Sequence, residues 1–143
     1  MSLRTAIHAA LQASTAVTDI LGTGSSIRHY AGRLPQAPEV PFAVSYEITS
    51  VAQETHGAAT DAEDTLDETL LQFSCYAETL TAALALRGAI RAALLDPTET
   101  AAAAILRAAG IVVTAPETRE QYEAGVDLHC AQLDLTFFHN PNT

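Results

Sequence analysis

The chain of 143 residues has no tryptophan, two cysteines, and no lysine among its seven basic residues. Seventeen acidic residues give a formal charge of −10. Such a chain lacks the cations with which DNA- and RNA-binding proteins neutralise phosphates. Its apolar runs are interrupted within about ten residues, and its N-terminus lacks the basic start and apolar core of a signal peptide. We therefore expect neither tight nucleic-acid binding nor membrane insertion nor a secreted protein.

The two cysteines, Cys75 and Cys130, both lie in apolar strand patterns. A free cysteine in such a position behaves as a small hydrophobe, so we expect buried thiols without a disulfide. A metal site built from both cysteines and a histidine is an alternative, but no Cys-x-x-Cys or His-x-x-x-His spacing supports it. His129, next to Cys130, would point to the opposite face of a strand. We expect no metal and no cofactor.

The chain is organised around residues 66–95, which read as a strand that passes directly into a helix. Apolar residues alternate along the strand at Leu71, Phe73, Cys75 and Ala77. From Glu78 the apolar spacing becomes helical. The stripe that would cover a sheet comprises Thr79, Ala82, Ala83, Leu86, Ala89, Ile90, Ala93 and Leu94.

The opposite side of this helix is not plainly polar. Leu80, Leu84 and Leu95 are interleaved there with Arg87 and Arg91. We predict a second packing surface, formed either with the same domain or with another subunit, and the candidate subunit contacts are Leu80, Leu84, Arg87 and Arg91. The alternative is an ordinary core helix with two arginines that extend into solvent.

The remaining elements follow from the same patterns. Ser2 is a plausible cap for a helix over residues 3–14, and Gly22 is placed to end a second helical turn in the left-handed conformation. Asp96, Pro97 and Glu99 have the spacing of a helix start, and Gly110 is placed to end that helix. Strands are expected at 27–31, 42–49, from 111 until a break near Pro116, and 126–138.

This order predicts an α+β fold with a mainly antiparallel sheet of about four to five strands and helices packed on one face. Residues 1–143 would form a single domain. The stretch at about 53–67 is rich in Ala, Thr, Asp and Glu and should protrude as a polar hairpin or loop. Its carboxylates lack the glycine that turns a calcium loop, so we interpret it as a solvated arm.

No catalytic motif is visible. The five histidines belong to no recognisable nucleophile motif, and the Gly-containing loop at 22–26 lacks the lysine and third glycine of a phosphate-binding loop. We therefore expect a binding or assembly role and no enzymatic activity. A small ligand-binding or hydrolytic enzyme is one alternative, and it would need a pocket that gathers at least two of His8, His29, His129 and Asp134.

The order of elements resembles the tail-completion or tail-terminator proteins of long-tailed bacteriophages and gene transfer agents. The matching features cover nearly the whole chain. They are the N-terminal helix with its Val17–Gly22 turn, the strand at Ile27, the Pro41-Phe42-Ala43-Val44 strand opening, the acidic hairpin, and Leu71–Ala77 leading into the central helix. The Ala-rich helix from Pro97 to Ala109 is longer than this family pattern suggests.

The resemblance implies a subunit made in the host cytoplasm that forms a hexameric ring in the virion tail. The ring would sit at the head-proximal end of the tail tube, end its polymerisation and join it to the head connector. Its partners would be copies of itself, the tube protein, the connector or stopper, and DNA in non-specific passage. Carboxylates could line the channel and repel DNA. The candidates are Asp61, Glu63, Asp64, Glu117, Glu120 and Glu123. A head-side connector or stopper of the same particles is the main alternative.

Overall fold

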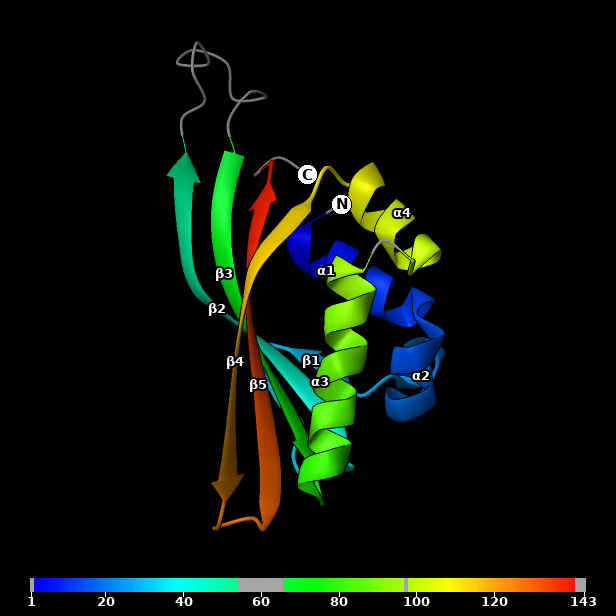
Figure 1. Cartoon of the computed structure of the whole chain (residues 1–143), viewed down its shortest axis with the longest axis vertical. Helices are drawn as coiled ribbons and strands as arrows, with labels where there is room; N and C mark the ends of the chain where they lie inside the picture. The colour runs from blue at the N-terminus through cyan, green and yellow to red at the C-terminus, as the bar shows by residue number, and fades with distance from the viewer. Residues whose placement is uncertain (1, 54–65, 97, 141–143) are drawn as a thin grey trace.

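The computed structural model describes residues 2–53, 66–96 and 98–140 of the chain. The helices gather on one side of a long twisted sheet (Figure 1). In chain order the elements are α1 (Leu3–Ala13), α2 (Thr15–Leu21), the short 3-10 helix η1 (Gly24–Ser26), β1 (His29–Ala31), β2 (Phe42–Gln53), β3 (Leu66–Ala77), α3 (Leu80–Leu95), α4 (Thr100–Ala108), β4 (Val112–Glu123) and β5 (Leu128–His139).

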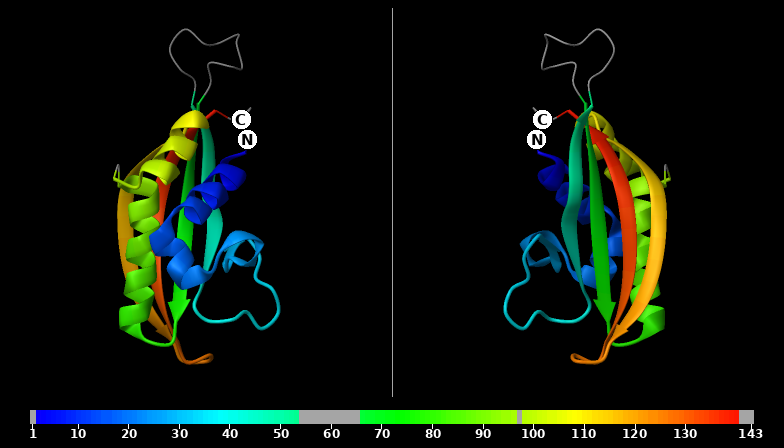
Figure 2. Two further views of the ribbon diagram at one scale, coloured as in Figure 1. Left: turned by 90° about the vertical axis from the view of Figure 1, so that its right-hand side faces the viewer. Right: turned by 90° about the vertical axis from the view of Figure 1, so that its left-hand side faces the viewer.

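The sheet has five strands in the order β1-β2-β3-β5-β4. Every neighbouring pair is antiparallel except the short β1, which runs parallel to β2. The α+β fold expected from the sequence, with its helices on one face, is therefore confirmed. In the right-hand view of Figure 2 the strands lie in front of the helices, so none of the described helices covers the other face of the sheet. We call this second face the open face.

The core lies between the helices and the central strands β3 and β5. Phe73 on β3 pairs with Leu133 on β5, and both side chains are fully buried on the helix-covered face. Leu86 and Ile90 of α3 are fully buried against them, as the helical stripe predicts. Burying large aliphatic side chains of this kind contributes about 1.5–3 kcal/mol each, which makes α3 a main stabiliser of the sheet.

Serine side chains cap the N-termini of the first two helices. The backbone N–H of Thr5 donates to Ser2 Oγ at 3.2 Å, which confirms the predicted cap of α1. Ser14 caps α2 in the same way through the N–H of Val17. Gly22 follows α2 with a φ of 96° but a ψ of 168°, so the helix ends where expected without the left-handed helical conformation that we predicted.

The start of α4 differs from the expectation. Asp96 is the C-cap of α3, and its carboxylate accepts hydrogen bonds from the N–H and hydroxyl of Thr98. This local turn takes the carboxylate away from a capping role, so α4 starts only at Thr100, with Glu99 as its N-cap. Pro97, the expected first helical residue, lies outside the described residues.

The end of α4 confirms the role of Gly110. Its φ of 70° is in the left-handed region, and its N–H donates to the carbonyl of Arg107. The N–H of Ile111 donates to the carbonyl of Leu106 at 2.9 Å, which completes the two-bond arrangement known as a Schellman motif. Glycine adopts this conformation without steric cost, so the chain turns here from α4 into β4.

Pro116 does not end the strand, contrary to our expectation. β4 runs from Val112 to Glu123, and its pairing with β5 shifts register between Thr114 and Glu117. Proline lacks the N–H that a central strand must donate, but an edge strand with a bulge tolerates it. The carboxylates that follow Pro116 therefore lie on a strand.

The strands that flank the predicted arm are longer than expected. β2 extends to Gln53, which pairs with Leu66 at the start of β3. The ends of the predicted 53–67 arm thus belong to a strand pair, and its remaining residues, 54–65, lie outside the described residues.

Candidate assembly surfaces

The outward side of α3 is the first candidate surface. Leu80 is 43% exposed and Arg91 is exposed, whereas Leu84 is partly buried and packs against the core. Gly88 lies between them with open space where a Cβ would stand. A shallow hollow of about 310 Å³ results, lined by Gly88, Arg91, Ala92, Leu95 and Asp96.

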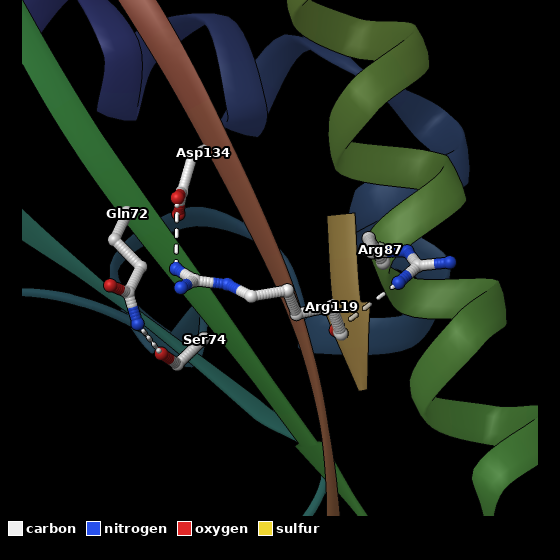
Figure 3. Close-up of polar contacts among 5 residues, drawn as sticks. All are labelled: Gln72, Ser74, Arg87, Arg119 and Asp134. Carbon is white, nitrogen blue, oxygen red and sulfur yellow. Dashed lines mark hydrogen bonds and ion pairs between the residues drawn. The ribbon is translucent and has the colours of Figure 1, made fainter. Parts of the chain in front are cut away.

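Arg87 has a partner within the chain. Its guanidinium lies 2.7 Å from the Glu120 carboxylate and donates to the carbonyl of Arg119 on β4. Figure 3 shows the guanidinium reaching from α3 to β4. The Arg87 side chain is only 16% exposed. Its contacts link α3 to the edge strand β4. Arg91, by contrast, makes no hydrogen bond or ion pair with any described residue.

The open face carries a polar row that crosses four strands. Tyr46 on β2 pairs with Gln72 on β3, Gln72 pairs with Asp134 on β5, and Asp134 pairs with Glu117 on β4. Side chains of paired residues project from the same face of a sheet, so these four lie side by side on the open face.

Arg119 neutralises one carboxylate of this row. Its guanidinium donates to Asp134 Oδ2 at 2.9 Å (Figure 3). The other oxygen, Asp134 Oδ1, is buried and has no hydrogen-bond partner among the described residues. Burying a carboxylate oxygen without a donor is costly, so the ion pair with Arg119 is what compensates for the burial of this aspartate.

Sequence reasoning named Asp134 only as a possible enzyme residue and did not find Arg119. The available signal was an aspartate among the outward positions of a strand whose inward residues are apolar. That pattern alone does not reveal a partner from another strand.

The predicted channel carboxylates divide into three sets. Glu117, Glu120 and Glu123 lie on β4 and not in a loop, so that part of the expectation was wrong. Glu117 and Glu123 project from the open face, whereas Glu120 projects toward α3 and pairs with Arg87. Asp61, Glu63 and Asp64 lie outside the described residues.

A second hollow lies at the end of the open face where β2 begins and β3 ends. Its volume is about 480 Å³, and its lining is mostly apolar, with Leu34, Pro38, Val40, Phe42, Tyr76, Glu123, Val126 and Leu128. The rings of Phe42 and Tyr76 stack with centroids 5.0 Å apart. The hollow brings together no pair of groups able to act as nucleophile and base.

Two of the four residues that an enzyme site would need come together. His8 Nδ1 on α1 lies 3.0 Å from His29 Nδ1 on β1, and His29 Nε2 lies 3.0 Å from Ser45 Oγ. Burial, with a smaller contribution from His8, lowers the pKa of His29 to about 4. His129 instead contacts the ring of Tyr122. The first pair is a partly buried structural contact between helix and sheet, not a cleft.

The cysteines face opposite sides of the sheet. Cys75 projects toward the helices and Cys130 toward the open face, and both are free and fully buried. They therefore cannot share a disulfide or a metal ion. Burial raises the pKa of both thiols, which keeps them protonated. In the described part of the chain, no three His, Cys, Asp or Glu residues are placed to hold a metal ion.

None of the described helices has the length and apolar character needed to cross a membrane. The described residues form a small α+β fold with two candidate assembly surfaces. The model of the family described as Tail completion protein gp17 matches residues 5–139. The chain belongs to this family of phage tail completion proteins, which confirms the resemblance found in the sequence; it is a structural protein and not an enzyme. No curated protein matches the chain.

Proposed function

We propose that the protein forms a hexameric ring at the head-proximal end of the phage tail tube. The ring ends tube polymerisation and provides the surface to which the head connector or stopper binds. The observation that carries this proposal is the family match over residues 5–139, because completing a tail requires contact with its end. The proposed role is the same in the tail of a phage and in the tail of a gene transfer agent.

The surfaces of the subunit support a ring. A closed ring is built from heterologous contacts, in which one patch of each subunit meets a different patch of the next. The chain offers two such patches: the outward side of α3, with Leu80, Leu84 and Arg91, and the open face of the sheet. Arg87, the fourth candidate contact, would position α3 and β4 through its pair with Glu120.

The charge of the subunit supports passage of DNA through the ring. Phosphates are repelled by a lumen lined with carboxylates, so DNA would move through without binding. We assign this role to Asp61, Glu63 and Asp64 of the arm and to Glu123. Glu120 contributes less because Arg87 neutralises it, and Glu117 lies beside Asp134 in the row on the open face.

The test is to delete the gene from a phage or prophage that encodes it and to examine the particles by electron microscopy. We expect tubes of uncontrolled length and tails that do not join heads. Purified protein added to the extract should restore joined particles of normal length. Normal free tails together with heads that lose their DNA would instead assign the protein to the head side, as a stopper.

A point variant makes the test specific to the predicted contact. Arg91→Glu should fail to restore joining, because it reverses a charge on the outward side of α3. Arg107→Glu makes the same charge change at an exposed position of α4 and should restore joining. Equal restoration by both variants would contradict the assignment of Arg91 to a subunit contact.

A further inference from the structure

None of the described helices covers the open face of the sheet, although exposed side chains line it. Glu117 at one end of the polar row is exposed, and Tyr46 at the other end is 37% exposed. α3 shows the converse features. It is covered by the chain's own sheet on one side and presents an arginine without a partner among the described residues on the other.

The charges on these two surfaces are complementary. Glu117 and Asp134 lie opposite each other on β4 and β5, and among the described residues the ion pair at this point is that of Arg119 with Asp134. This end of the row therefore carries one more negative than positive charge. Arg91 would supply the missing cation, and a guanidinium has enough N–H groups to contact the exposed Glu117 and the rim of Asp134 together.

The spacing of the two surfaces also agrees. Leu84 and Arg91 are seven residues apart on one flank of α3, which corresponds to about 10 Å along a helix axis. Tyr46 and Asp134 are two strands apart in the row, which is also about 10 Å across a sheet. A helix that places Arg91 over Asp134 thus places the apolar Leu84 over the aromatic ring of Tyr46.

The outward side of α3 permits a close approach. Gly88 has no side chain, and Arg91 and Leu95 line the hollow beside it. A bulky residue at this position would hold a neighbouring sheet away. The glycine leaves room for side chains of an opposing open face, among which Gln72 lies at the middle of the row.

We propose that the open face of each subunit is covered by α3 of a second copy of this chain, with Arg91 of one copy paired to Asp134 and Glu117 of the next. This inference rests on the proposed ring and identifies its contact. The sheet is then sandwiched between its own helices and a helix of the neighbour. Because the two patches differ, repetition of the contact produces a ring or a helical array and not a closed symmetric dimer.

Cysteine cross-linking tests this contact in assembled tails. The two natural cysteines are fully buried, so they provide a background without accessible thiols. In an Arg91→Cys/Glu117→Cys variant, which retains the Asp134 pair with Arg119, a short bismaleimide should join neighbouring subunits. We expect loss of the monomer band and a ladder that stops at the size of the ring. Arg107→Cys/Glu117→Cys is the matched control and should remain monomeric on the gel.

The possible failures are distinguishable. If the wild-type protein is absent from the tail end, the proposed function is wrong. If the variant is present there but cross-links no more than the control, the proposed contact is wrong. If the variant fails to fold or to enter tails, an electron cryo-microscopy map of the wild-type tail end decides: α3 of one subunit against the open face of the next supports the contact, and any other packing overturns it.

Discussion

The Nδ1 atoms of His8 and His29 lie 3.0 Å apart, which joins the first helix to the first strand through two imidazole rings. A hydrogen bond between two ring nitrogens needs one donor and one acceptor, so it cannot persist when both rings are protonated. The ring of His29 is also buried and stacks near Phe73. The attachment of α1 to the sheet edge therefore depends on pH.

We predict that acid destabilises the protein through His29. Its pKa falls from 6.5 to about 4 on folding, so between these pH values the unfolded chain binds more protons than the folded one. Stability is retained above pH 6.5 and is lost as the pH falls toward 4, by up to about 3 kcal/mol from this residue. Urea unfolding at pH 6.5 and pH 4 should show a smaller difference for His29→Gln. An unchanged difference would contradict this account.

The second prediction concerns the core side of α3. Leu86→Ala should lower the free energy of unfolding by about 2–5 kcal/mol, because it leaves a cavity at a fully buried position. Leu80→Ala is the control on the same helix and should cost less than about 1 kcal/mol, since that side chain is 43% exposed. Denaturant unfolding of the isolated protein measures both. Similar losses would mean that the helix is rotated relative to our description.

The third prediction contrasts two glycines. Gly88→Ala should stabilise the protein by about 0.5–1 kcal/mol, because it lies within a helix and a Cβ there meets nothing within 4 Å. Gly110→Ala should destabilise it by about 1 kcal/mol or more, because its φ of 70° disfavours a side chain despite equally open space. Thermal unfolding of the two variants checks the opposite signs. The same sign for both would contradict the conformational argument.

The fourth prediction concerns the arm. Since Gln53 and Leu66 already pair, residues 54–65 can be replaced by an Asn-Gly turn that suits a two-residue hairpin. The unfolding free energy of the isolated protein should change little, because the segment has few apolar residues to bury. Ring formation or docking to the tube should weaken. Normal completion of tails by the shortened protein would show that the arm is only a spacer.

The last prediction tests the lumen assignment. Changing Asp61, Glu63 and Asp64 together to Lys should create DNA binding that weakens steeply with salt, because the new cations would contact phosphates in the channel. Particles with this variant should eject their genomes more slowly than wild-type particles. Filter binding over a salt series and an ejection assay measure the two effects.

The control for this experiment carries the same change of charge elsewhere. Asp19, Glu39 and Glu78 are exposed on α2, on the loop before β2 and before α3. Changing these three to Lys should leave ejection at the normal rate. If both triple variants eject normally and with the same salt dependence, the arm carboxylates belong to the outside of the ring.

Patterns carried by neighbouring residues made the helices and strands predictable. The alternation of Leu71, Phe73 and Cys75 was correct, and so was the helical stripe from Ala83 onward, but Thr79 and Ala82 at its start are exposed because Thr79 is the N-cap of α3. The capping prediction at Asp96 was wrong because its carboxylate had a competing partner two residues away, in Thr98. The pairing is interrupted near Pro116 as predicted, but the loop expected after it was wrong. An edge strand tolerates the proline, and the order of strands in a sheet cannot be read from a local sequence pattern.

Contacts between distant elements could not be predicted. Arg119 and Asp134 are neighbours only because β4 and β5 pair in one register, and a shift of one residue would place them on opposite faces. Arg87 was expected at a subunit contact from its helical position, but its approach to Glu120 depends on how α3 crosses the sheet. That crossing is set by the whole core and not by the residues near the arginine.

The bulge in β4 affects how the protein behaves before a tail is available. An unpaired edge strand of twelve residues is a template on which other chains can add, and continued addition leads to fibrils. The register shift before Glu117 and the missing N–H of Pro116 divide this edge into two shorter pieces, and carboxylates follow on the second. Under the proposed function, this divided edge would keep newly made subunits from adding to one another edge to edge before they meet a tail.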